Sequence, residues 1–289
     1  WGINAKTMMD RPASPAPSTS ASKAARRAGY SSAPPHTLAS LGELQLRNTA
    51  VFPFETLASM LHAPVHVDLP SVQDKLLRQG RGGYCFELNQ LFLLLLQALG
   101  FEARGLTGRV VMGGPEDAQT ARTHMLVLVT IEGVRYIADV GFGGMVPTGP
   151  LLLDSEAPQS TPHEPFRLTL VDGTYTLRAL VTDSWRAMYL FDLQAVAEID
   201  YTVGSWYVST HPDSPFLGQL MVARTGHRLR KTLNNGSFAV HRMGANSERR
   251  EVTQVDELIE LLAREFALHL PDLPHIRQAV ARMIVPASV

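Results

Sequence analysis

Hydrophobic residues recur at helical spacing in the first organised part of the chain. Leucines between residues 38 and 46 fall on one face of a predicted helix, and a second short helix is predicted over residues 71–78. A strongly apolar run over residues 86–99, ended by Gly100, predicts a buried third helix. Before it lies Gly80-Arg-Gly-Gly-Tyr-Cys85, a break that no helix would carry comfortably.

After Gly100 the spacing changes to the alternation typical of strands. Strands are predicted over residues 101–112, 123–131 and 134–140, with Glu132-Gly133 as a tight hairpin turn between the last two. Further strand signals cover residues 166–170, 174–181, 229–233 and 237–241. A closing helix has Leu258, Leu261, Leu262 and Phe266 among the residues of its apolar face. The order helical, then β-rich, then mixed favours an α+β protein with segregated layers.

The N-terminal segment has a different composition. Residues 10–37 contain no Val, Ile, Leu, Met, Phe or Trp and are dominated by Ala, Ser and Pro. Such a segment buries too little apolar surface to offset the entropy cost of ordering it. We therefore interpret residues 1–29 as a disordered leader or a tag-derived tail.

Composition and charge exclude several classes of protein. The 289 residues include 26 basic and 27 acidic side chains, and the basic ones are scattered, so nucleic acid is not expected as a partner. The longest apolar run is far shorter than the roughly 20 residues that cross a bilayer, so we expect a cytoplasmic protein without a membrane partner. No feature of the sequence indicates an oligomeric state.

The motifs for metals and nucleotides are also missing from the sequence. A single cysteine rules out an intrachain disulfide, and a structural zinc site normally needs several thiolates. There is no His-Glu-x-x-His pair or clustered acidic loop, so no metal is expected. The glycine-rich stretches match neither a Walker A loop nor a dinucleotide fingerprint, which argues against nucleotide hydrolysis and hydride transfer.

The one thiol, Cys85, lies at the predicted start of the apolar helix. The free N–H groups and dipole of a helix N-terminus favour a thiolate, which is the form of cysteine that attacks. The preceding glycines let the backbone turn sharply there. The alternative is an ordinary buried cysteine, because free cysteine is among the most buried residue types.

A base for such a thiol is suggested by the predicted hairpin. With the turn centred between residues 132 and 133, His124 faces residue 141, so Asp139 lies within two residues of the opposite position. Diagonal neighbours on paired strands are within reach of each other's side chains. His124 and Asp139 are therefore a candidate base and orienting acid. A structural histidine and a turn-forming aspartate remain the alternatives at this point.

Three separated motifs resemble those of the arylamine N-acetyltransferases, in the same order and with similar spacing. They are Arg81-Gly-Gly-Tyr-Cys-Phe-Glu-Leu-Asn89, Thr123-His-Met125 and Asp139-Val-Gly-Phe-Gly-Gly144. The resemblance implies a catalytic core like that of cysteine proteases and transglutaminases. It also implies three parts: a helical bundle over residues 30–100, a β-barrel-like domain over 101–210 and an α/β lid over 211–289.

The resemblance also implies a reaction and a site. Cys85, His124 and Asp139 would form a catalytic triad, and acetyl-CoA would donate an acetyl group to Cys85. An arylamine, hydrazine or arylhydroxylamine would then collect it in a ping-pong mechanism. By resemblance, Phe54, Phe142 and Phe216 would line the amine slot, and Gly143 and Gly144 would lie along the CoA arm.

Two motif residues have no obvious chemical step. For Arg81 and Glu87 we expect a buried ion pair or loop-to-helix hydrogen bonds that support Cys85. Alternatives to the whole assignment are an amide synthase of the same fold, a thiol hydrolase, a transglutaminase-like crosslinker and a non-catalytic binding protein.

Overall fold

The computed structural model describes residues 34–270 and 276–284, so the predicted leader over residues 1–29 lies outside the described residues. The first part of the chain is helical, as its leucine spacing indicates. Its elements are α2 (Leu38–Val51), α3 (Leu57–Met60), α4 (Leu69–Gln73), η1 (Asp74–Arg78) and α5 (Cys85–Ala98). The helix predicted over residues 71–78 starts earlier, because the Asp68 carboxylate caps it by accepting from the Ser71 N–H. Its second half, η1, is wound as a π-helix.

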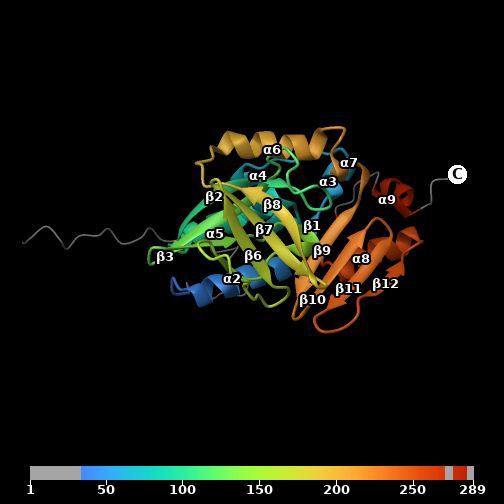
Figure 1. Cartoon of the computed structure of the whole chain (residues 1–289). Helices are drawn as coiled ribbons and strands as arrows, with labels where there is room; N and C mark the ends of the chain where they lie inside the picture. The colour runs from blue at the N-terminus through green and yellow to red at the C-terminus, as the bar shows by residue number, and fades with distance from the viewer. Residues whose placement is uncertain (1–33, 271–275, 285–289) are drawn as a thin grey trace, which may run out of the picture.

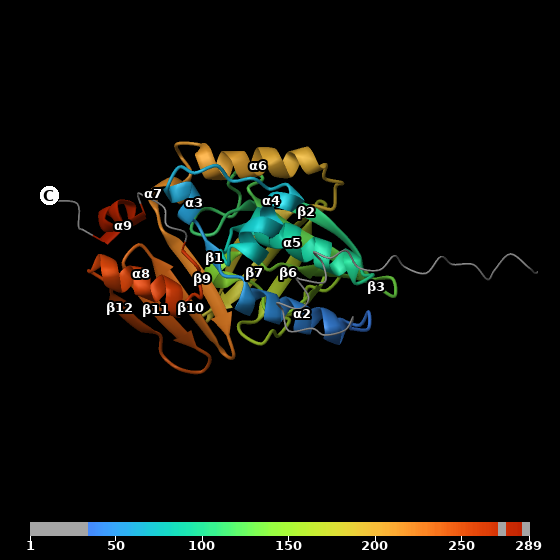
Figure 2. The same ribbon diagram turned by 180° about the vertical axis from the view of Figure 1, so that it is seen from behind.

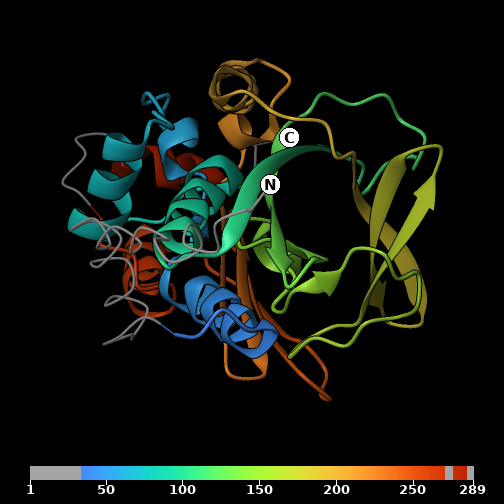
Figure 3. The ribbon, with the colours of Figure 1, turned by 90° about the vertical axis from the view of Figure 1, so that its left-hand side faces the viewer.

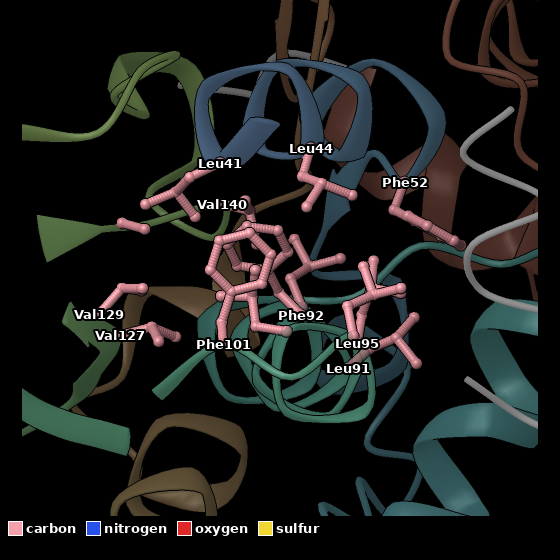
Figure 4. Close-up of a cluster of buried hydrophobic side chains, with 14 of the residues drawn as sticks. Leu41, Leu44, Phe52, Leu91, Phe92, Leu95, Phe101, Val127, Val129 and Val140 are labelled. Carbon is pink, nitrogen blue, oxygen red and sulfur yellow. The ribbon is translucent and has the colours of Figure 1, made fainter. Parts of the chain in front are cut away.

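A buried apolar cluster joins α2 to α5. Figure 4 shows side chains of α2 directed toward those of α5, and the same cluster continues onto the sheet beyond them. Its labelled members are Leu41, Leu44, Phe52, Leu91, Phe92, Leu95, Phe101, Val127, Val129 and Val140. Because α5 also packs against β2 (Glu102–Val110) and β3 (His124–Ile131), the helix that begins at Cys85 is held between α2 and the sheet.

The middle of the chain forms a seven-stranded antiparallel sheet with the order β5-β4-β3-β2-β8-β7-β6. Figure 3 shows these strands curving round toward closure, with α2 and α5 on one side. The remaining strands are β4 (Val134–Ala138), β5 (Leu151–Leu152), β6 (Phe166–Val171), β7 (Thr174–Val181) and β8 (Ser184–Phe191). The predicted hairpin register is confirmed, since Ile131 pairs with Val134 and Val127 with Ala138. Glu132 and Gly133 both have positive φ, as this type of turn requires.

The C-terminal part builds a second antiparallel sheet with the order β1-β9-β10-β11-β12. Its strands are β1 (Phe54–Glu55), β9 (Met221–Gly226), β10 (Leu229–Asn234), β11 (Ser237–Arg242) and β12 (Glu248–Glu251). Helix α8 (Val255–Arg264) covers one face of this sheet, with α9 (Ile276–Ile284) beside it, as Figures 1 and 2 show from opposite sides. Because β1 pairs with β9, the chain segment between α2 and α3 is part of the C-terminal sheet.

Two helices connect the sheets. Helix α6 (Glu198–Thr210) lies across the top of the molecule in Figure 1, and the short α7 (Pro215–Gly218) follows it. The sequence analysis did not predict α6. Its outer face carries Ile199, Val203 and Trp206, which are all exposed, so apolar residues on both faces obscure the helical period. No helix among the described residues is long and apolar enough to cross a membrane.

Candidate active site

Cys85 is the first residue of α5 and follows a loop that has no room for side chains at two positions. A Cβ on Gly82 would lie 2.3 Å from the Pro53 carbonyl oxygen, and one on Gly83 would lie 2.7 Å from Glu87 Oε2. The glycines therefore let the loop thread between β1 and α5. Tyr84, in extended conformation, then leads directly into the helix.

The structure brings the predicted base and acid together. His124 opens β3 and Asp139 follows β4, and His124 Nε2 lies 2.7 Å from Asp139 Oδ2. The Cys85 side chain is a second hydrogen-bond partner of His124, and its sulfur lies 3.5 Å from the Thr123 carbonyl oxygen. All three side chains are buried, so their charges interact in a region with little water.

The surroundings favour a charged imidazole. Burial opposes the charge on His124, but the Asp139 carboxylate and the hydrogen bonds with Asp139 and Cys85 outweigh it and raise the pKa of His124 to about 10. Burial also opposes the charge on Asp139, yet the pKa of Asp139 is lowered, because His124 and further donors stabilise the carboxylate. A charged imidazole beside the sulfur stabilises the negative charge that a cysteine carries when it acts as a nucleophile.

This charge couples folding to pH. The pKa of His124 is about 10 in the folded protein against an ordinary value of 6.5, so its charge stabilises the fold fully below pH 6.5. That contribution is lost as the pH rises through 10. Urea titrations should show the free energy of unfolding falling between these two values, and falling less in His124→Gln. Equal pH dependence in the two proteins would contradict the assigned charge.

The Asp139 carboxylate accepts four hydrogen bonds, two of them from side chains that were not predicted from the sequence to belong to the site. Asn89 Nδ2 donates to Oδ1 at 2.9 Å, and the Tyr189 hydroxyl donates to Oδ2 at 3.0 Å. The other donors are His124 and the Gly141 N–H. Asn89 also donates to the Met125 carbonyl and accepts from the Val140 N–H, so it joins α5 to both strands of the hairpin. In the sequence, Asn89 is recognisable only as a polar residue within an apolar helix, one turn after Cys85.

Removing the Tyr189 hydroxyl should lower the reactivity of the Cys85 thiol modestly. In Tyr189→Phe one donor to Asp139 is lost, and we expect alkylation of the thiol by iodoacetamide to slow about fivefold, the equivalent of ~1 kcal/mol for one hydrogen bond. The rate of alkylation would measure this effect. Tyr175→Phe is the matched control, because Tyr175 is also buried in the barrel-like sheet but stacks on Phe191. A Tyr189→Phe variant no slower than this control would refute the contact's role.

A cavity of about 610 Å³ opens onto the thiol. Cys85 and His124 lie in its wall together with the three predicted aromatic residues, Phe54, Phe142 and Phe216. The Phe54 and Phe216 rings meet edge to face with centroids 5.9 Å apart. The Phe142 ring stands edge to face on His124, with centroids 5.0 Å apart. The cavity is therefore apolar and aromatic where it meets Cys85 and His124.

Gly143 and Gly144 also line this cavity and lead from Cys85 toward the second sheet. Gly143 has φ +63°, and a Cβ on Gly144 would lie 2.9 Å from Thr232 Cγ2 on β10. Beyond them the wall includes His241 and Arg249. Burial and the neighbouring Arg249 lower the pKa of His241, so Arg249 is the cation at this end at neutral pH. The cavity thus joins an apolar end to a cationic end.

Arg81 and Glu87 do not pair with each other. Arg81 binds Glu55, with Nη2 2.6 Å from Oε1. Glu87 accepts from the Tyr84 N–H at 3.1 Å and from Lys75 Nζ at 2.7 Å. Of the two alternatives, Glu87 thus makes the loop-to-helix hydrogen bond, and Arg81 makes a buried ion pair with a different acid.

The described residues contain no group of three or more His, Cys, Asp or Glu side chains that could hold a metal ion. The chemistry available at the cavity is that of a thiol, an imidazole and a carboxylate, which together suit acyl transfer through a covalent intermediate.

Comparison with known proteins adds a consistent set of relatives. A family described as N-acetyltransferase matches residues 37–274. The arylamine N-acetyltransferase / N-hydroxyarylamine O-acetyltransferase of Salmonella typhimurium is 38% identical over 242 residues, which is 83% of this chain and 85% of that protein. The arylamine N-acetyltransferase of Mycolicibacterium smegmatis is 38% identical over 251 residues, covering 86% and 91%.

Solved structures agree with these matches. The arylamine N-acetyltransferase of Mycobacterium marinum superposes with a TM-score of 0.87 at 34% identity, covering 92% of this chain and all of that one. Its structure in complex with CoA superposes with a TM-score of 0.84 at 35% identity, covering 91% and 97%. The α+β fold with a barrel-like sheet is therefore one that solved proteins share.

Proposed function

Because the chain belongs to the arylamine N-acetyltransferase family, we propose that it acetylates arylamines, hydrazines and arylhydroxylamines through an acetyl-cysteine formed on Cys85. The chain is an acetyltransferase whose co-substrate is acetyl-CoA. The residue assignments rest on one observation, which is that a single cavity is lined by Cys85, His124 and the three phenylalanines Phe54, Phe142 and Phe216.

In the first half-reaction the Cys85 thiolate attacks the thioester carbonyl of acetyl-CoA. The new S–C bond forms a tetrahedral oxyanion, which collapses with loss of the CoA thiolate. The His124 imidazolium, held by Asp139, gives its proton to that leaving sulfur. One thioester replaces another of similar energy, so neither direction is strongly favoured.

In the second half-reaction an arylamine nitrogen attacks the acetyl carbonyl on Cys85. His124, now neutral, accepts the proton that the nitrogen loses, and the thiolate of Cys85 leaves. The products are the acetamide and the enzyme in its starting thiolate–imidazolium form. Aromatic amines suit this step because they are weakly basic and remain neutral, and hence nucleophilic, at pH 7.

The tetrahedral oxyanion needs hydrogen-bond donors. We propose the Cys85 backbone N–H for this role, because it lies in the first turn of α5, where N–H groups have no acceptor within the helix. The Gly141 N–H is not available, since it donates to Asp139 at 2.8 Å.

The two substrates would occupy the two ends of the cavity. An aromatic ring fits between Phe54, Phe142 and Phe216, where the wall is apolar. The pantetheine arm of CoA would run along the backbone of Gly143 and Gly144, with a phosphate toward Arg249. The shape and charge of the wall support this orientation.

Truncating an aromatic wall residue should affect the amine and spare the acyl donor. For Phe216→Ala we expect the KM for an arylamine to rise about tenfold, because part of an aromatic contact is lost. Acetylation of Cys85 by acetyl-CoA should stay within about twofold of wild type. Measuring the two half-reactions separately tests this, and Phe216→Leu, which keeps apolar volume, is the control. A selective loss of the first half-reaction would contradict the assignment.

One assay separates acetyl transfer from the alternatives on the same scaffold. The enzyme is incubated with p-nitrophenyl acetate, with and without an arylamine. An acetyltransferase releases nitrophenol faster when the amine is present, because the amine removes the acetyl group from Cys85. A thiol hydrolase would show no gain. A second assay with acetyl-CoA as the donor identifies an amide synthase, which would transfer acetyl to no arylamine or hydrazide.

A further inference from the structure

Four charged side chains lie together beside the loop over residues 79–84, which leads into α5. Glu55 of β1 and Glu87 of α5 are fully buried, Arg81 of the loop is nearly so, and Lys75 of η1 is 16% exposed. Lys75 Nζ lies 2.7 Å from Glu87 and 3.9 Å from Glu55. Two acids and two bases balance, so the cluster has no net charge when all four are ionised.

The two acids are held unequally. Glu55 binds both Nε and Nη2 of Arg81 and accepts from the Leu57 N–H. Within the described part of the chain, Lys75 is the only cationic side chain in contact with Glu87. Burial opposes ionisation of both acids, but the pKa of Glu55 is lowered by Lys75 and Arg81, whereas burial keeps the pKa of Glu87 raised despite Lys75. Ionisation of Glu87 therefore depends on one ammonium group.

Glu87 is directly connected to the nucleophile. Its Oε2 accepts from the N–H of Tyr84, the residue before Cys85, at 3.1 Å. Gly83 packs so closely on the Glu87 side chain that a Cβ there would lie 2.7 Å from Oε2. The carboxylate thus fixes the peptide through which the chain enters α5, and a charged acceptor makes that bond stronger than a neutral one.

Lys75 lies in η1, which is wound as a π-helix. π-Helical turns are rare and often occur at functional sites. The Lys75 carbonyl also accepts from the Arg81 N–H at 3.2 Å, so the same turn holds the start of the loop. A recess of about 580 Å³ opens onto Lys75 and Glu87, and the other titratable groups that line it are His66, Asp74, Arg78 and Arg81. Protons can therefore reach Glu87 from solvent.

We propose that Lys75 is a positioning residue for the Cys85 thiol: its ammonium keeps Glu87 ionised, and the ionised carboxylate holds the Tyr84 peptide so that Cys85 faces His124. The proposal rests on the proposed function, in which Cys85 is the acetylated residue. Without Lys75, the pKa of buried Glu87 rises further, and once Glu87 takes up a proton its hydrogen bond to the loop weakens. Raising the pH ionises Glu87 again and restores that bond.

The test compares Lys75→Met with the double variant Lys75→Met/Glu87→Gln. Two rates are measured from about pH 6.5 to about pH 9.5, acetylation of Cys85 by acetyl-CoA and alkylation of Cys85 by iodoacetamide. We expect Lys75→Met to be about tenfold slower than wild type at neutral pH, with a deficit that shrinks as the pH rises. In the double variant the ratio to wild type should not change with pH, because glutamine does not titrate there.

Arg78→Met is the matched control, since Arg78 is in the same turn but pairs with Asp74 on the surface. It should match wild type. A Lys75→Met variant within about twofold of wild type at neutral pH would overturn the proposal. So would a deficit that is constant with pH, which is what loss of packing alone produces.

If Lys75→Met does not fold, two other variants carry the test. Lys75→Arg keeps the charge and should follow the wild-type pH profile, and the double variant leaves no unpaired acid at Glu87. A pH-dependent deficit in either would overturn the proposal. Failure of the proposed function itself would appear differently, as absence of an acetyl group on Cys85 in the wild-type protein.

Discussion

Cys85→Ala should abolish acetyl transfer, lowering kcat/KM by a factor on the order of 10⁴ or more, while the protein remains folded. The reason is that the proposed reaction passes through a bond to Cys85 Sγ, and the chain has no second cysteine to replace it. The substitution removes one small side chain from a cluster that also holds Tyr84, Phe86 and Met125, so the packing change is slight. Steady-state assays with an arylamine, alongside circular dichroism and thermal unfolding, would measure both effects.

Cys85→Ser is the control for the nature of the nucleophile. Serine keeps the size of the side chain, but its hydroxyl is not ionised beside an imidazolium, so activity should also be lost. Transfer by either variant within about tenfold of wild type would show that the acetyl group does not pass through Cys85.

Asp139→Asn should reduce transfer about 10³- to 10⁴-fold. The Asp139 carboxylate fixes the His124 ring through Nε2 and stabilises its charge. An asparagine must place its NH₂ group either toward His124 and Tyr189 or toward Asn89 and the Gly141 N–H, all of which are donors in the wild-type protein. In either orientation the asparagine NH₂ group faces other donors where the carboxylate offered an acceptor. The His124 ring therefore loses its orientation and its charge.

The measurement is the rate of Cys85 acetylation and of alkylation against pH. With the carboxylate gone, the pKa of His124 should fall from its raised value, so the imidazole loses its charge at a lower pH than in the wild-type protein. Asp154→Asn, in an exposed pair with Arg135 on the edge of the same sheet, is the matched control. Activity of Asp139→Asn within a few-fold of that control would refute the assigned role.

How far the sequence predicted the site depended on whether contacts were local. His124 and Asp139 lie on one hairpin, and the turn at Glu132-Gly133 sets their register, so their proximity followed from position alone. Cys85 could be placed at a helix start from the glycines before it. Its approach to His124 depends on how α5 packs against β3, which periodicity does not report.

The contributions that were missed come from long-range packing. Tyr189 reaches Asp139 from β8, a strand that the sequence pattern did not predict and that pairs with β2, which lies far earlier in the chain. Glu55 and Lys75 meet Arg81 and Glu87 because β1 and the π-turn both fold back on the loop. Contacts between residues on different elements leave no periodic pattern in the sequence. The sequence could therefore show that charged residues lie near a motif, but not which of them form ion pairs.

The most direct test of the central claim is the mass of the intact protein after incubation with acetyl-CoA alone, followed by peptide mapping. Ping-pong transfer through Cys85 predicts one added acetyl group, located on the Cys85 peptide, blocked by prior alkylation with iodoacetamide and removed when an arylamine is added. An unmodified protein that still acetylates the amine, or an acetyl group on another residue that the amine removes, would contradict the account.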